Sequence, residues 1–140
     1  MIRCVFVEDE EMARNVLKSL LVQYCPDVMV CAEADDIVAG KNMIETFRPD
    51  LVFLDIEMPV IKGIELAKRI KVICPNARII FATGYGNYAL EAFGVDAVDY
   101  IMKPYEPEDI KRAYNKALLI RDVVAENHVF IKTFGFFKTH

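Results

Sequence analysis

The sequence predicts an α/β protein in which a parallel sheet is enclosed between two layers of helices. Five short apolar runs alternate with helical stretches over about the first 124 of its 140 residues. Such alternation is typical of parallel strands joined by right-handed crossovers. The run Leu51–Asp55 is apolar throughout until it ends on a carboxylate, as expected of a strand buried on both faces.

The first predicted strand, Ile2–Val7, leads into four consecutive acids, Glu8 to Glu11. Apolar residues then recur at helical spacing from Met12 to Tyr24. Helix capping and a favourable interaction with the helix dipole explain Glu10 and Glu11, but they leave open why two further acids sit at the tip of the strand. The residues of this helix expected to face the core are Met12, Val16, Leu17, Leu20, Leu21 and Tyr24.

Val28–Ala34 is predicted as a second strand, and its mixed composition places it near an edge of the sheet. Asp35 or Asp36 is expected to cap the next helix, which runs to about Phe47. Its expected inward residues are Val38, Met43, Ile44 and Phe47.

The rest of the chain continues the alternation of strands and helices after the strand at Leu51–Asp55. Pro107 is expected at the first position of the last helix, where its missing N–H costs nothing. The remaining predicted elements are a loop from Pro59 to Gly63, a helix Ile64–Ile73 with Ile64, Leu66, Ala67 and Ile70 inward, a strand Arg78–Thr83, a short helix Asn87–Phe93, an edge strand Ala97–Met102 and a helix Glu108–Val124.

Composition and charge narrow the class of protein. The chain is 54% hydrophobic and 27% charged, which suits one folded domain, and its net charge of −4 argues against nucleic-acid binding through its general surface. The cysteines form no C-x-x-C pair and are interpreted as buried apolar residues in a reducing, cytoplasmic compartment. They are Cys4, Cys25, Cys31 and Cys74. Neither a signal peptide nor a membrane-spanning stretch is predicted.

Polar residues gather at the C-terminal tips of the predicted strands. In a flavodoxin-like (βα)5 doubly wound sheet with strand order 2-1-3-4-5, the first and third strands are neighbours beside the ligand crevice. Glu8, Asp9 and Asp55 would therefore converge there, with Thr83 and Lys103 nearby. Clustered carboxylates need a cation, and an all-oxygen set favours Mg²⁺. A metal, an ammonium and a hydroxyl around one carboxylate suit phosphoryl transfer to that carboxylate.

Each of these residues also has an ordinary structural interpretation. Asp55 alone would suit the start of a loop, because aspartate favours turns. Thr83 alone would reflect the β-propensity of threonine, and Lys103 alone would be a solvated charge. Their combination at one sheet edge is what favours a site.

Four motifs together resemble a receiver domain of two-component response regulators. They occur in order and with suitable spacing over about residues 2–124. The matching segments are Val7-Glu8-Asp9-Glu10, Leu54-Asp55-Ile56-Glu57-Met58-Pro59 with Gly63, Ala82-Thr83-Gly84, and Asp99-Tyr100-Ile101-Met102-Lys103-Pro104.

The resemblance implies a role for each site residue. Asp55 would accept the phosphoryl group in a self-catalysed transfer from a sensor histidine kinase or a small phosphodonor, so that the protein is a switch and not a true enzyme. Asp9, Asp55 and the Glu57 carbonyl would bind Mg²⁺ directly, and Glu8 would act through a metal-bound water. Thr83 and Lys103 would contact the phosphoryl oxygens, and Tyr100 would swing inward when Thr83 moves. The Lys103–Pro104 bond would be cis.

Some positions depart from the usual pattern of such receivers. Glu8 stands where aspartate is commoner, which would alter metal affinity. Gly84 stands where alanine is frequent and would open the phosphoryl group to water. Glu57 and Tyr85 fill positions that tune dephosphorylation.

The resemblance also implies an output. The fourth helix, fifth strand and fifth helix would form the face that switches and docks partners or a second copy, and Asp99 and Arg112 either form ion pairs there or are solvated charges. Residues 1–125 would be the receiver. Residues 126–140 would be a linker and a candidate first strand of an effector domain, most similar to winged-helix DNA-binding regulators, with a LytTR-type domain second. DNA would be bound only through that missing domain.

Two other functional classes remain open. Haloacid-dehalogenase-like phosphatases also use an aspartate at a strand end, although this chain lacks room for a cap over a substrate pocket. A stand-alone receiver acting through protein–protein interaction without DNA binding is the other alternative.

Overall fold

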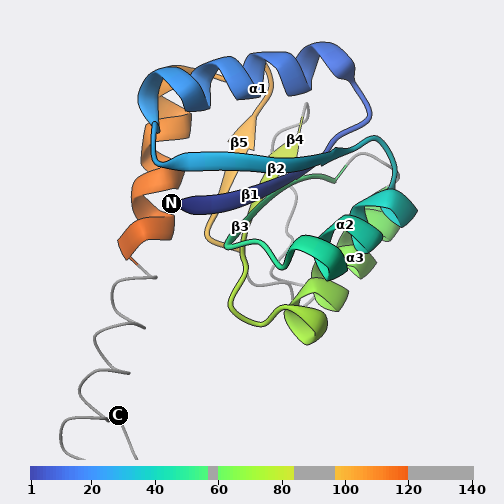
Figure 1. Ribbon diagram of the computed structural model, residues 1–140. Helices are drawn as coiled ribbons and strands as arrows, with labels where there is room; N and C mark the ends of the chain where they lie inside the picture. Colours follow the sequence, from blue (N-terminus) through green and yellow to red (C-terminus); the bar gives the residue numbers. More distant parts are fainter. Residues whose placement is uncertain (57–59, 84–96, 120–140) are drawn as a thin grey trace, which may run out of the picture.

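The computed structural model describes residues 1–56, 60–83 and 97–119. Its centre is a five-stranded sheet in the order β2-β1-β3-β4-β5, and every neighbouring pair is parallel. The predicted flavodoxin-like order is therefore confirmed (Figure 1). The strands are β1 Ile2–Val7, β2 Val28–Ala34, β3 Leu51–Asp55, β4 Arg78–Thr83 and β5 Asp99–Met102.

Helices cover both faces of this sheet. α1 (Glu11–Tyr24) and a helix over residues 107–119 lie on one side, and α2 (Ile37–Phe47) and α3 (Val60–Ile73) lie on the other (Figure 1). Alternation along β1 divides its side chains between the two layers. Cys4 and Phe6 pack with the side of α1, whereas Val5 and Val7 pack with the side of α2 and α3.

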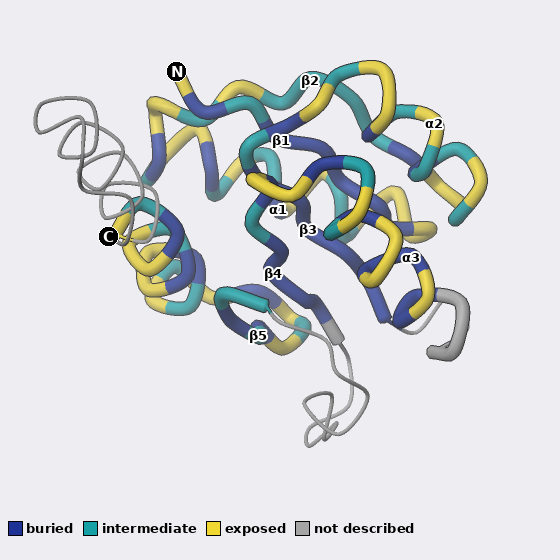
Figure 2. The backbone as a smooth tube through the Cα atoms, turned by 90° about the horizontal axis from the view of Figure 1, so that it is seen from below, coloured by how far each residue is buried: buried dark blue, intermediate teal, exposed yellow. Residues whose placement is uncertain are grey.

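Burial is greatest in the middle of the sheet. Every residue of β3 is buried, whereas β2 is mostly half-buried, as its predicted edge position requires (Figure 2). The rings of Phe6 and Phe53 meet edge to face across β1 and β3, with centroids 5.7 Å apart. The apolar run that ends on Asp55 is thus the best-enclosed strand of the sheet.

Most residues predicted to face inward from α1 and α2 do so, but three do not. Met12, Val16 and Val38 were expected to face the core but are 79%, 44% and 71% exposed. In α1 the buried stripe runs through Leu17 and Leu21, and Met12 lies about two and a half turns before Leu21, on the opposite side. Ala13 takes the inward place near the start of the helix.

In α2 the inward stripe runs through Gly40 and Ile44, which turns Val38 away from the sheet. Gly40 allows the helix to approach β1 closely, because a Cβ there would lie 2.9 Å from Cγ2 of Val7. Asp36 is the capping residue, and its Oδ1 accepts a hydrogen bond from the Ala39 amide at 2.7 Å.

Helix α3 begins at Val60, so the loop predicted from Pro59 to Gly63 is wrong over its last four residues. Gly63 does not mark a loop. It lets the first turn of α3 pass close to the end of β3, because a Cβ at this position would lie 3.2 Å from Cα of Ile56. All four residues predicted to face inward from α3 are buried.

The remaining boundaries differ little from the prediction. β5 begins at Asp99, two residues later than expected, although the Val98 amide already donates to the Ile79 carbonyl at 2.8 Å. Pro107 is the first helical residue, as predicted. All four cysteines are free thiols, three of them buried and Cys31 half-buried.

Several predictions lie outside the described residues. They concern Glu57, Gly84 and Tyr85, the helix Asn87–Phe93, the end of the last helix and the segment 126–140. Within the part of the chain that the structure describes, no helix is long and apolar enough to span a membrane.

Candidate functional site

The carboxyl edge of the sheet brings together residues that are far apart in the sequence. Asp55 is the last residue of β3, Glu8 follows β1, and Lys103 follows β5. The parallel register aligns Val7 with Leu54 and therefore sets the two acidic tips side by side.

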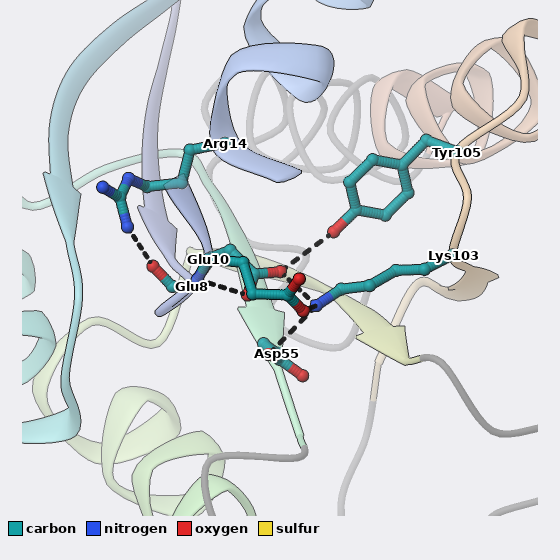
Figure 3. Close-up of polar contacts among 6 residues, drawn as sticks. All are labelled: Glu8, Glu10, Arg14, Asp55, Lys103 and Tyr105. Carbon is teal, nitrogen blue, oxygen red and sulfur yellow. Dashed lines mark hydrogen bonds and ion pairs between the residues drawn. The ribbon is translucent and has the colours of Figure 1, made fainter. Parts of the chain in front are cut away.

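The Lys103 ammonium lies among three carboxylates (Figure 3). Its Nζ is 2.6 Å from Oε1 of Glu8, 3.2 Å from Oε1 of Glu10 and 3.2 Å from Oδ2 of Asp55. The Lys103 side chain is only 13% exposed, and that of Asp55 only 2%. The predicted convergence of Glu8, Asp55 and Lys103 is therefore present in the structure.

Burial opposes the positive charge of Lys103. The hydrogen bond that Lys103 donates to Glu8 and the charges of Asp55 and Glu8 outweigh this effect, so the pKa of Lys103 is raised above its ordinary value. Lys103 is therefore a permanent cation in this pocket.

Glu8 is held from three directions. Its Oε1 accepts hydrogen bonds from Lys103 and from the Tyr105 hydroxyl at 3.3 Å, and its Oε2 accepts one from the Glu10 amide at 3.1 Å. Burial raises the pKa of Glu8 to about 7, with the nearby Asp55 carboxylate acting in the same direction and Lys103 against it. Glu8 is thus a carboxyl group whose negative charge is costly even beside Lys103.

Tyr105 was not among the residues predicted for the site. It is 8% exposed, and burial together with the Glu8 and Asp55 charges raises its pKa above the ordinary value, so it remains a neutral donor. The available signal was an aromatic residue with a polar end immediately after Lys103-Pro104.

Arg14 was also missed. Its Nη1 donates to the backbone carbonyl of Glu8 at 2.6 Å, and its Nε lies 3.3 Å from Oε1 of Glu33 on β2. Arg14 thereby ties the turn after β1 to the neighbouring strand. The signal in the sequence was a cation one helical turn after Glu10.

The acidic group fits a divalent cation. Carboxylate oxygens of Glu8, Asp9 and Glu10 lie within 4.8 Å of one another, and Asp55 reaches the same ammonium as Glu8. Lys103 contributes one positive charge, whereas the four carboxyl groups contribute up to four negative ones. A set of hard oxygen donors with excess negative charge suits Mg²⁺.

The sequence interpretation of Glu10 as a helix cap is right for its position and wrong for its side chain. Glu10 occupies the N-cap position of α1, but its side chain makes no capping hydrogen bond. The carboxylate turns toward Lys103 instead, because an ammonium offers it a stronger partner than the helix amides.

Three other predicted site residues lie on β4, on β5 or just after β5. Thr83 ends β4 beside Met102 in the register, and the structure describes its backbone. The Tyr100 ring is stacked on Phe81, with centroids 5.7 Å apart. The Lys103–Pro104 peptide bond is cis, the form that the resemblance to receiver domains implied.

A second charged cluster surrounds Asp99 at the start of β5. Its Oδ2 is 2.8 Å from Nε of Arg112, and its Oδ1 is 3.5 Å from Nζ of Lys116. Arg112 also contacts Asp109 at 2.8 Å, and the hydrogen bonds that it donates to Asp99 and Asp109 raise its pKa. The ion pair between Asp99 and Arg112 is therefore formed.

Comparison with known proteins gives a consistent result. The family model described as the response regulator receiver domain matches residues 4–115. The chain is 39% identical over 125 residues to the sensory transduction protein LytT of Bacillus subtilis, and the match covers 89% of this chain and 52% of that protein. It is 43% identical over 116 residues to the sensory transduction protein LytR of Staphylococcus haemolyticus, covering 81% of this chain and 44% of that protein.

Solved structures agree with this match. The response regulatory domain of mrkE from Klebsiella pneumoniae has a TM-score of 0.74 and 29% identity, covering 85% of this chain and 97% of that one. The chain spans about half the length of LytT and LytR.

Proposed function

The chain belongs to the response regulator receiver domain family, and from this premise we propose that it is a switch activated by phosphorylation of Asp55. Receiver domains typically bind Mg²⁺, act with histidine kinases and are not themselves true enzymes. The observation that carries the proposal is the Lys103 ammonium lying between the buried carboxylates of Glu8 and Asp55.

The chemistry assigned to Asp55 is a single transfer. One carboxylate oxygen forms a bond to the phosphorus of a phosphohistidine or of a small phosphodonor as the bond from phosphorus to the donor breaks. Lys103 neutralises charge on the phosphoryl oxygens, and the Thr83 hydroxyl contacts one of them. Asp9, Asp55 and the Glu57 carbonyl would hold Mg²⁺, with Glu8 acting through a water. When bound, the ion supplies positive charge and alignment for the transferred group.

The switch is proposed to follow from this new charge. A phosphoryl group on Asp55 draws Lys103 and Thr83 toward it, and Tyr100 moves into the space that Thr83 leaves. These movements bias β5 and the helix over residues 107–119 toward a second arrangement. The face around Asp99 and Arg112 is the proposed docking surface for a partner or for a second copy of the chain.

The proposed output is control of transcription. In this proposal residues 1–125 would be the receiver, and residues 126–140 would lead into an effector domain that binds DNA. The similarity to LytT and LytR favours a LytTR-type domain over the winged-helix type that the sequence alone favoured.

Intact-mass spectrometry tests the phosphorylation. The protein is incubated with acetyl phosphate and Mg²⁺, and wild type should gain one phosphoryl group while Asp55→Ala gains none. Asp27→Asn is the matched control, because Asp27 is exposed at the start of β2, at the opposite edge of the sheet. Equal labelling of wild type and Asp55→Ala would refute the assignment.

The two alternative classes give different results. A phosphatase of the haloacid-dehalogenase type would turn over an added phosphate ester steadily. A stand-alone interaction module that had lost phosphorylation would show no spectral change with beryllium fluoride and Mg²⁺.

A further inference from the structure

We propose that Tyr105 is a positioning residue for the cation site, which it serves by holding the Glu8 carboxylate through the phenolic hydroxyl. The proposal rests on the proposed function, because it assigns Glu8 to the binding of a divalent cation. It adds a residue from the segment after β5 to the acids at the tips of β1 and β3.

The geometry around Glu8 supports this role. The Tyr105 hydroxyl and the Lys103 ammonium both reach Oε1 of Glu8, at 3.3 and 2.6 Å, while the Glu10 amide reaches Oε2 at 3.1 Å (Figure 3). Both carboxylate oxygens are therefore fixed before any metal arrives. When a cation binds, Lys103 is the donor that must turn toward the phosphoryl group, and Tyr105 is then the side-chain donor that stays on Oε1.

Packing alone does not explain a tyrosine here. The Tyr105 ring belongs to the cluster formed with Ile101, Ile110 and Ala113, and a phenylalanine ring would fill the same space. The hydroxyl adds a polar group that must find a partner once it is buried, and that partner is Glu8.

The length of Glu8 is part of the same arrangement. Glutamate carries one more rotatable bond than aspartate, so its carboxylate reaches farther but loses more freedom when it is held in one place. Glu8 is proposed to act on the ion through a water, and partners that fix such a supporting group commonly strengthen metal affinity, so that removing one costs about tenfold or more.

Mg²⁺ titration followed by amide chemical shifts tests the proposal. Tyr105→Phe should raise the Kd for Mg²⁺ about tenfold. Tyr24→Phe is the matched control, because the Tyr24 ring also contacts the helix over residues 107–119, through Lys111 at 4.6 Å, and lies away from the acidic group. Its Kd should equal that of wild type.

A double-mutant cycle separates positioning from a general loss of structure. In the Glu8→Asp background the shorter carboxylate withdraws from the Tyr105 hydroxyl, so adding Tyr105→Phe should cost no further affinity. A 3-fluorotyrosine at position 105 should also show a ¹⁹F shift during the Mg²⁺ titration that follows the same Kd as the amides.

The outcomes distinguish the two proposals. Unchanged Mg²⁺ affinity in Tyr105→Phe, or an equal loss in the wild-type and Glu8→Asp backgrounds, would overturn the role of Tyr105 and leave the proposed function standing. A wild-type protein that binds no Mg²⁺ would overturn both.

Discussion

The metal-free protein should lose stability as pH rises through the neutral range, and Glu8 should be the cause. Its pKa is about 7 in the folded chain against an ordinary value of 4.5. Between these values the folded state holds a proton that the unfolded state has released, so the free energy of unfolding falls as pH increases. The stabilisation is complete below about pH 4.5 and is lost above about pH 7. A difference of this size corresponds to about 3 kcal/mol.

Urea unfolding in the presence of a chelator measures this effect. Wild type and Glu8→Gln are compared between pH 5 and 8, because glutamine keeps the length of the side chain but does not titrate. The other titrating groups are common to both proteins, so the wild-type free energy should fall by about 3 kcal/mol more than that of the variant. Saturating Mg²⁺ should remove most of the wild-type decline, because the ion binds the charged form. Parallel pH profiles for the two proteins would refute the reasoning.

Three further predictions concern the same pocket and its support. The Kd for Mg²⁺ should fall as pH rises toward 7, by up to about tenfold per pH unit, because Glu8 must lose its proton. Calorimetry should find a flatter dependence of Kd on pH in Glu8→Gln, and equal dependence in the two proteins would contradict this. Lys103→Met should destabilise the chelated protein by about 3 kcal/mol at pH 8 and much less at pH 5, where Glu8 is protonated. Urea unfolding checks this against the exposed control Lys68→Met, and an equal cost at both pH values would argue against it. Gly40→Ala should lower the free energy of unfolding by about 1–3 kcal/mol despite its gain in helix propensity, because the new Cβ meets Cγ2 of Val7 at 2.9 Å. Part of this loss should vanish in a Val7→Ala background. A Gly40→Ala protein more stable than wild type would contradict the packing.

The sheet could be predicted from the sequence because its strands are short, separate and strongly apolar. Leu51–Asp55 is the clearest case, because an apolar run with no polar face is typical of a strand buried in the middle of a parallel sheet. The parallel arrangement then fixed where the strand ends meet. The convergence of Glu8, Asp55 and Lys103 followed from topology, without any knowledge of side-chain positions.

Helix orientation and local contacts were harder to predict. Met12 and Val16 fit an apolar helical stripe, but α1 packs Ala13 and Leu17 against the core and leaves Met12 and Val16 exposed. Gly63 resembled a loop residue, whereas its lack of a Cβ serves the close approach of α3 to Ile56. Neither choice can be made from periodicity, since both depend on the shape of the opposite surface.

The contacts of Glu10 and Tyr105 escaped prediction for a different reason. Each residue satisfies a common local rule, as a helix N-cap and as an aromatic core residue, and these rules concern neighbours in the sequence. Their actual partners, Lys103 and Glu8, are more than ninety positions away. Only the fold brings these groups together.

The group of acids around Lys103 is a costly arrangement that a divalent cation would relieve, and this cost is what suits it to switching. In the metal-free protein Lys103 is shared among Glu8, Glu10 and Asp55, and Glu8 retains a raised pKa despite that contact. A divalent ion on the acids would take over the neutralising role, so that Lys103 becomes available to the phosphoryl oxygens on Asp55. Lys103 and Tyr105 flank Pro104, on the segment that joins β5 to the helix over residues 107–119. A change in the partner of Lys103 therefore acts directly on the start of that helix, whereas Tyr105 keeps the segment anchored to Glu8.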